Sequence, residues 1–191
     1  MFMRGEKRER MLRVLLSENE ALSKRELSKR ANCARSWSIY FLKELEKKGL
    51  VKGTEVKDKK RLITYWLGIH RKPKKWKSYM VKDPLKLLKS TGLDYVLTTF
   101  QAENLVQKHL FPSRIDIYVK EEDMQKWHDL MLKNGLYGKG NVRIIFDDVQ
   151  VMYGKRKING LNVVSIPQLI IDLFSEGGVC EEAAEILLKN V

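Results

Sequence analysis

The sequence predicts an α+β protein with a small N-terminal domain of three helices and a β-hairpin, followed by a larger mixed domain. Short segments of helical and strand periodicity follow one another without the strict alternation of a doubly wound sheet. Positive charge is concentrated in one half: residues 1–82 hold 24 Lys and Arg against 9 Asp and Glu, a net +15, whereas residues 83–191 hold 13 against 15, a net −2. We therefore expect domains at residues 1–69 and 83–191, joined by a basic linker at 70–82.

The stretch from residue 23 to 51 carries helix signals at helix-turn-helix spacing. Ser23 and Glu26 form a capping box, which predicts a helix from the next residue onward. The small residues at 31–33 suit a tight turn, and Gly49 supplies the left-handed residue that commonly ends a helix. The sequence therefore predicts two short helices joined by a turn, with a preceding helix at residues 6–17 completing the core.

A helical wheel of the second of these helices separates an apolar face from a polar face. The apolar face can pack against the other helices, while the polar face can enter a groove. The first residues of a recognition helix are those that reach base edges in helix-turn-helix proteins. A solvated face on an ordinary surface helix is the alternative. We expect the following residues to read the major groove of double-stranded DNA: Arg35, Ser36, Trp37, Tyr40 and Lys43.

Two strand-like runs follow, at residues 50–56 and 62–67, with basic residues between them. They predict a hairpin with a cationic tip. A helix-turn-helix followed by such a hairpin resembles the winged-helix family of transcriptional regulators. The sequence from Leu42 to Val51, LKELEKKGLV, also looks like the usual end of the recognition helix in that family. The resemblance implies a wing that lies along the DNA, where lysines bond phosphate. The residues expected there are Lys57, Lys59, Lys60 and Arg61.

Residues 70–77 hold six basic residues in eight, with a proline inside. Contact with the DNA backbone and a plain solvated linker are equally compatible with this composition. Trp76 is unusual in such a run, and the sequence does not decide whether it packs between domains or stacks on a ligand. The residues taken as DNA-binding candidates in this segment are Arg71, Lys72, Lys74 and Lys75.

The second half mixes strands and helices. A glycine-rich loop is expected at residues 135–140, and Asp147-Asp148 is expected to join two strands of a hairpin. The predicted strands are 95–97, 114–119, 142–146, 149–153 and 161–164, and the predicted helices begin at residues 84, 98, 121, 165 and 180.

Two segments of this half resemble the C-terminal domain of AbiE-type antitoxins, the regulators of type IV toxin-antitoxin systems. One is Tyr95-Val-Leu-Thr98 with Ala102, and the other is VVSIPQLIIDLF (163–174) with Gly177-Gly178. The resemblance implies an autoregulating repressor that binds inverted repeats at its own promoter and opposes a nucleotidyltransferase-like toxin, without necessarily forming a stable complex with it. The motif class separately suggests a homodimer, or two monomers side by side, on a palindromic operator. Thr99 departs from the family pattern, which has glycine there.

An enzymatic function has weaker support. Asp116, Asp147 and Asp148 are carboxylates that could hold a divalent metal for phosphoryl transfer. However, a nucleotidyltransferase-like D-x-D motif would need a second carboxylate where Tyr118 stands. We therefore expect a solvent-facing strand residue at Asp116, a turn at 147–148, no enzyme activity, no metal and no cofactor. The alternative is a nucleotidyltransferase-like enzyme, or an adaptor, that the basic domain targets to nucleic acid.

Cysteine usage and hydropathy suggest a cytoplasmic protein without a membrane partner. Cys33 and Cys180 are far apart and lack the spacing of a disulfide framework or zinc site. The segment from residue 1 to 11 has no apolar core of the kind found in signal peptides, and no run of eighteen apolar residues is present.

Overall fold

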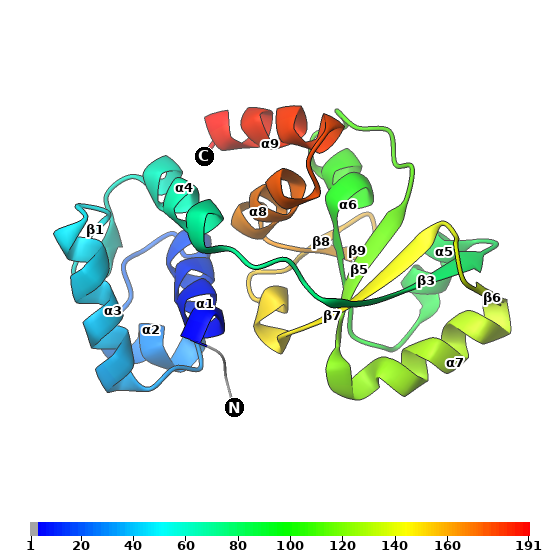
Figure 1. The fold of residues 1–191 in the computed structure, drawn as a ribbon, viewed down its shortest axis with the longest axis horizontal. Coiled ribbons are helices and arrows are strands. Elements are labelled where there is room, and N and C mark those ends of the chain that lie inside the picture. Colours follow the sequence, from blue (N-terminus) through cyan, green and yellow to red (C-terminus); the bar gives the residue numbers. More distant parts are fainter. Residues whose placement is uncertain (1–3) are drawn as a thin grey trace.

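The computed structural model describes residues 4–191, with side chains from residue 6 onward; residues 1–3 of the segment considered above as a signal peptide lie outside it. The chain has the expected α+β fold. A helical N-terminal group stands at one end, and a mixed β-sheet with its own helices forms the rest (Figure 1).

The N-terminal group contains the three helices that the sequence predicts, together with a fourth, α4. Leu12, Leu27 and Leu45, each from a different helix, are completely buried. The elements of this group are the helices α1 (Arg4–Ser17), α2 (Lys24–Arg30), α3 (Arg35–Lys47) and α4 (Lys59–Ile69), with the strands β1 (Val51–Lys52) and β2 (Glu55–Val56).

The predicted hairpin with its lysine-rich tip is wrong. Residues 50–56 are not one strand but contain the whole hairpin, because Gly53 (φ +62°) turns the chain between β1 and β2. Residues 62–67, expected to form the second strand, lie in α4. The Asp58 side chain caps this helix by accepting the Arg61 N–H at 3.0 Å. β-Branched and aromatic residues favoured a strand, but burial follows helical spacing, with Leu62, Ile63 and Trp66 completely buried.

The second half is built on a mixed sheet. Within the described residues the strand order is β6-β3-β7-β5-β4-β9-β8, in which β5 pairs in parallel with β7, β4 pairs in parallel with β9, and the remaining neighbours are antiparallel. The strands are β3 (Lys75–Val81), β4 (Val96–Thr98), β5 (Ile115–Lys120), β6 (Gly135–Tyr137), β7 (Val142–Asp147), β8 (Arg156–Ile158) and β9 (Leu161–Val163).

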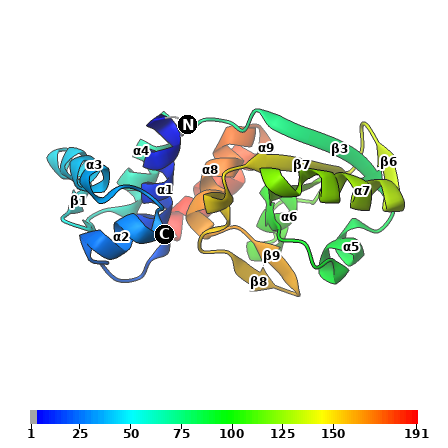
Figure 2. The same ribbon diagram turned by 90° about the horizontal axis from the view of Figure 1, so that it is seen from below.

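Helices cover both faces of this sheet. Alternate residues of a strand point to opposite faces. On one face the Tyr79 hydroxyl is hydrogen-bonded to Nδ1 of His128, on α7, at 2.9 Å. On the other face Asp116 and Tyr118 bond side chains of α6 and α8. Figure 2 shows the sheet and its helices at the opposite end of the molecule from α3. The helical elements of this half are α5 (Pro84–Ser90), α6 (Thr99–Val106), the 3-10 helices η1 (Glu121–Asp123) and η2 (Val149–Met152), α7 (Met124–Asn134), α8 (Ile166–Glu176) and α9 (Val179–Lys189).

Three further expectations for this half need correction. The 70–82 segment, predicted as a linker, contains β3, an interior strand of the sheet. The strand expected at 149–153 is η2, because Asp148 caps a 3-10 turn by accepting the Gln150 N–H at 3.1 Å. The loop at 135–140 contains β6, and its Gly140 lies so close to the backbone of Tyr79 that no side chain would fit there.

The two halves meet through α1 and α4, which pack against α8. Arg13 of α1 is 5% exposed, and its Nε donates to Oε1 of Gln168 on α8 at 2.7 Å. Its guanidinium also lies over the Trp66 ring, 5.4 Å from the ring centroid. Arg10, one turn earlier, pairs with Asp148. Arg10 and Arg13 therefore hold the two halves together.

We predict that Arg13→Ala destabilises the protein by about 2–4 kcal/mol, because a buried hydrogen bond to a charged group and the contact with Trp66 are lost together. The free energy of unfolding from urea titration measures this change. Arg8→Ala is the matched control: Arg8 lies on the same helix but is more exposed, and its ion pair with Glu44 should contribute no more than about 1 kcal/mol. Equal losses in the two variants would contradict the role assigned to Arg13.

Candidate functional site

Helices α2 and α3 form a helix-turn-helix. The Ser23 side chain accepts the Glu26 N–H at 3.1 Å, as the first half of the predicted capping box requires. Glu26 does not complete the box, because its carboxylate pairs with Arg30 at 2.8 Å. Asn32 adopts the left-handed conformation, with φ +48°, which lets the chain turn sharply between the helices.

Helix α3 has the two faces that its sequence predicts. Phe41 and Leu45 are fully buried against the other helices, whereas Tyr40 is 67% exposed and Lys43 is exposed. The helix lies at the end of the molecule farthest from the sheet, so the second half covers neither side chain (Figures 1 and 2). Arg35 and Ser36 are also exposed, at the start of the helix.

The carboxylates of α3 are held at the edges of this exposed face. Glu44 accepts from Arg8 at 3.2 Å and from the Tyr65 hydroxyl at 3.4 Å. Glu46 accepts the Gly53 N–H at 3.0 Å. The centre of the face around Lys43 is consequently polar and cationic, which suits contact with a polyanion.

Trp37 does not belong to this face. Its ring is only partly exposed and stacks on Phe41, with the ring centroids 5.3 Å apart and an interplanar angle of 21°. It therefore supports the core instead of reaching outward, contrary to its expected place in the base-reading set.

The cations expected on a wing lie elsewhere. Lys57, Lys59, Lys60 and Arg61 are exposed around the start of α4. Arg61 donates to the Lys48 carbonyl, just beyond the end of α3, at 3.4 Å, while Lys60 donates to the Lys189 carbonyl of α9 at 3.0 Å. This group flanks the C-terminal end of α3, whereas Arg35 and Ser36 lie at its other end.

The basic residues that follow α4 form a separate group. Arg71, Lys72 and Lys74 are exposed on the segment that runs from α4 toward the sheet, and Lys75 begins β3 and pairs with Glu121. Figure 1 shows this segment leading away from α3. The structure therefore divides the predicted DNA-binding residues among three places, of which α3 offers the most outward surface.

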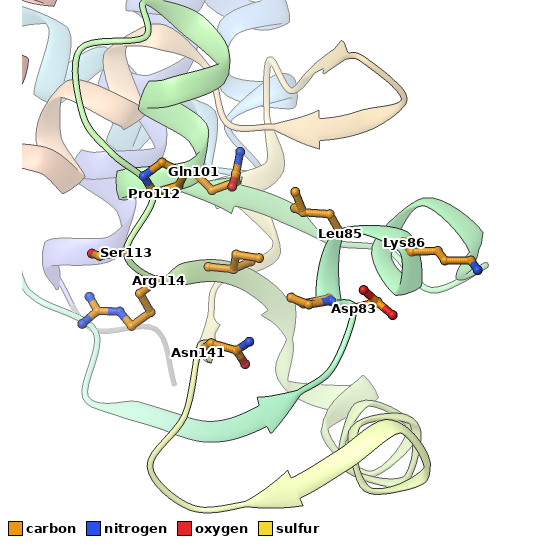
Figure 3. A pocket seen from close by; sticks show the side chains of 10 residues that line it. Asp83, Leu85, Lys86, Gln101, Pro112, Ser113, Arg114 and Asn141 are labelled. Carbon is orange, nitrogen blue, oxygen red and sulfur yellow. The ribbon is translucent and has the colours of Figure 1, made fainter.

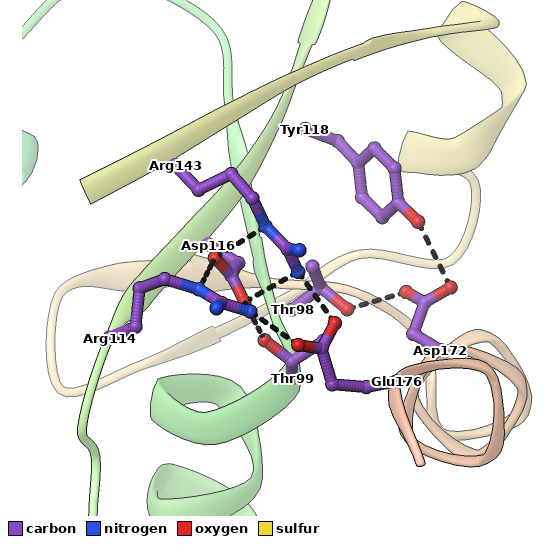
Figure 4. A network of polar contacts seen from close by, with 8 residues as sticks. All are labelled: Thr98, Thr99, Arg114, Asp116, Tyr118, Arg143, Asp172 and Glu176. Atoms are coloured by element: carbon purple, nitrogen blue, oxygen red, sulfur yellow. Dashed lines mark hydrogen bonds and ion pairs between the residues drawn. The ribbon is translucent and has the colours of Figure 1, made fainter. Parts of the chain in front are cut away.

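The second half contains a buried ionic network that sequence reasoning missed (Figure 4). Asp116, predicted to face solvent, is completely buried between two arginines. Arg114 and Arg143 reach it at 2.7 and 2.9 Å, and both arginines also bond Glu176, at 2.6 and 2.8 Å. The two positive charges of the arginines thus balance the two negative charges of the carboxylates. Burial disfavours an ionised Glu176, but the two arginines outweigh this effect and lower its pKa.

Thr99, whose position is occupied by glycine in the antitoxin pattern, has an unusual backbone conformation. It has φ +49°, a conformation that glycine adopts freely and that β-branched residues rarely adopt. Its hydroxyl donates to Asp116, and this bond offsets part of the conformational cost. The chain therefore keeps the backbone shape expected of a glycine and gains a polar contact with the network.

Asp172 links the two segments that carry the antitoxin resemblance. It is buried in α8 and accepts hydrogen bonds from Thr98, from the Tyr118 hydroxyl at 3.0 Å and from the Gln168 amide at 2.7 Å. Burial raises its pKa, and the three donors act in the opposite direction. The sequence does contain a signal for this site, because a carboxylate stands within the apolar run Ile170–Leu173. A buried acid needs hydrogen-bond partners, so its position predicts a polar cluster around it.

The carboxylates considered for a metal site do not come together. In the parallel pairing of β5 and β7, Asp116 is opposite Arg143 and Lys120 is opposite Asp147. Asp116 and Asp147 are thus four residues apart along the sheet, roughly 13 Å. In the described part of the chain, no three His, Cys, Asp or Glu side chains are grouped so that they could hold a metal ion.

Two cavities border the network. One, of about 340 Å³, has Gln101, Arg114 and Asn141 on its wall (Figure 3). Its polar groups are partly engaged, since Arg114 turns into the network and the Asn141 amide bonds the Val81 N–H and carbonyl, each at 2.9 Å. The other, of about 320 Å³, lies where His70 and Trp76 meet Arg143.

Comparison with known proteins does not assign the chain to a family. It matches no protein-family model, and neither the curated proteins nor the solved structures include a significant match. Among residues 4–191, no helix has the length and apolar character needed to cross a membrane. Function has to be inferred from the side-chain geometry described above.

Asp147 should make stability depend on pH. Burial raises its pKa to about 6, whereas the ordinary value is 3.8. The folded protein therefore holds the proton more tightly than the unfolded chain, and stability falls as pH rises from about 4 to above 6. We predict that Asp147→Asn raises the free energy of unfolding at pH 8 by up to about 3 kcal/mol. Near pH 4 the substitution should change the free energy of unfolding little.

Urea unfolding at a series of pH values measures this effect. Asp129→Asn serves as the control, because Asp129 is exposed on α7 and accepts a hydrogen bond from Gln125 of its own helix. An Asp147→Asn variant that is less stable than the parent at pH 8 would show that the ionised carboxylate is favourable there, contrary to this account.

Proposed function

We propose that the chain is a sequence-specific, DNA-binding transcriptional regulator that uses α3 as its recognition helix. The observation that carries this proposal is the outward face of α3, which presents Ser36, Tyr40 and Lys43 at the far end of the molecule. Thirteen residues give a helix roughly 20 Å long, and such a helix fits the major groove of B-DNA. The net +15 of residues 1–82 supplies the attraction to phosphate.

The revised positions of the other cations change their proposed roles. Arg61 and its neighbours at the start of α4 would contact phosphate beside the C-terminal end of α3, in place of a wing. Arg35 and Ser36 would reach base edges at the other end of the helix. Arg71, Lys72 and Lys74 lie away from α3, and they are left out of the proposed interface.

The second half is proposed to act as the antitoxin portion of a type IV, AbiE-like system. Thr98 and Asp172 come from the two segments that resemble that family. The Thr98 hydroxyl donates a hydrogen bond to Asp172 in the core of the second half. In this proposal the chain represses its own promoter in the cytoplasm as a homodimer on an inverted repeat. Its partner is a nucleotidyltransferase-like toxin. The alternative of a nucleotidyltransferase-like enzyme gains no support from the structure. Asp116 and Asp147 lie too far apart to hold one metal ion together.

We predict that Lys43→Ala weakens binding to a selected duplex by about tenfold or more, because a groove contact contributes about 1–3 kcal/mol. The operator is first selected from a pool of randomised duplexes, and affinity is measured by fluorescence anisotropy. Arg35→Ala should change the selected sequence as well as the affinity. Lys133→Ala removes the same charge from an exposed position on α7, far from α3, and should bind like the parent. Equal affinities of Lys43→Ala and Lys133→Ala would remove α3 from the interface.

The antitoxin role predicts that growth arrest caused by a nucleotidyltransferase-like protein encoded beside this gene is relieved by co-expressing this chain. Relief should persist in the Lys43→Ala variant, because that change affects DNA contact and leaves the second half intact. A toxic neighbour that the parent chain fails to neutralise at equal expression would argue against the antitoxin role while leaving DNA binding untouched.

A further inference from the structure

The 320 Å³ cavity lies where the segment that follows α4 runs over the second half. Its walls come from the segment after α4, which carries His70 and Trp76, and from the second half, which contributes Arg143 of β7 and Glu176 of α8. A cavity of this size is at the small end of the range that small-molecule sites occupy. Its position between segments far apart in sequence is also typical of such sites.

One buried polar atom at this cavity has no protein partner. The His70 side chain is 8% exposed, and its Nδ1 is held by Glu9 at 2.8 Å. Glu9 also accepts the Trp66 indole N–H at 2.9 Å, so the imidazole is fixed in one orientation. Nε2, on the opposite side of the ring from Glu9, is buried without a hydrogen-bond partner among the residues described. Buried polar atoms are nearly always bonded, so this nitrogen is available to a ligand at the cavity that His70 lines.

The ion pair with Glu9 favours the protonated form of His70, which donates at Nε2. Burial disfavours the imidazolium, but the hydrogen bond and the charge of Glu9 outweigh burial and raise the pKa of His70 above its ordinary value of 6.5. The protonated ring presents Nε2–H as a donor.

Two further cationic donors border the same space. Arg143 uses Nε and Nη2 on Asp116 and Glu176, and its Nη1 is bonded to no residue that the structure describes. Lys72 lines the cavity, is exposed, and forms no ion pair within the described chain. The carboxylates at this site are already satisfied, because Glu176 binds two arginines and Asp172 accepts three hydrogen bonds. The unused bonding capacity is therefore on donors.

An aromatic platform adjoins these donors. The Trp76 side chain is 58% exposed although it belongs to an interior strand, and it pairs in register with Ile145 of β7, which also lines the cavity. An exposed indole beside cationic donors can stack on a planar ring.

We propose that this cavity binds a mononucleotide, with its base on Trp76 and its phosphate bonded by Lys72, Arg143 and His70. Charge-assisted bonds of this kind are the strongest that a phosphate forms with side chains. The site does not depend on α3 or on DNA binding.

The proposal is tested by isothermal titration calorimetry of the full chain with AMP, together with ribose 5-phosphate and adenosine as probes that carry only the anion or only the ring. AMP should bind more tightly than either fragment. Lys72→Ala and Trp76→Ala should each weaken AMP binding about tenfold or more, which corresponds to losing one good contact. Both replaced side chains are exposed, so the variants should fold.

Two matched controls separate this site from other surfaces. Lys74→Ala removes an exposed lysine two positions from Lys72 that does not line the cavity, and Lys43→Ala removes the central charge of α3. Both should bind AMP like the parent. No heat of binding for AMP at millimolar concentration would overturn the proposal, as would AMP binding that survives in Lys72→Ala and Trp76→Ala. Ribose 5-phosphate binding as tightly as AMP would overturn the assignment of the base to Trp76.

Discussion

The arrangement of this protein depends on burying the guanidinium of Arg13 between the two halves. A buried charge is tolerated only where hydrogen bonds and neighbouring charges compensate its lost hydration. Here Gln168 accepts its Nε–H, and the Trp66 ring lies against it. Because α1 and α4 form this junction, the second half packs against them and leaves the polar face of α3 exposed.

Local signals predicted the helices well, since caps and periodicity act within a few residues. The cap at Ser23 and the burial pattern of α3 are as expected. The wrong secondary-structure predictions arose where the cap and the packing of a segment outweighed its composition. Residues 62–67 have a strand-like composition, yet the cap at Asp58 and the helical spacing of their buried side chains decide for a helix. In the hairpin of β8 and β9, Asn159-Gly160 is the turn, with φ +50° and +81°, and this strong local signal was overlooked.

The polar network could not have been predicted from spacing. The side chain of Asp116 meets Arg143 because β5 and β7 pair in one particular register, and a shift of one residue would send it to the other face of the sheet. Glu176 joins them from the end of α8, sixty residues further along the chain than Asp116. The signal that did exist was chemical: an aspartate at 172 within an apolar run has to be bonded once its helix is buried. The numbers of charged residues show that the first 82 residues are the basic part of the chain. They do not show which Lys and Arg side chains lie on α3, at the start of α4 or after α4.

Hydrogen–deuterium exchange with and without a selected DNA duplex would locate the DNA-binding surface on the protein. The account predicts slower exchange of backbone amides in α3 and at the start of α4 when DNA binds. It also predicts little change in β6 and α7, at the opposite end of the molecule. Protection that centres on the sheet, with α3 exchanging at the same rate in both samples, would contradict the assignment of the outward helix as the DNA-reading element.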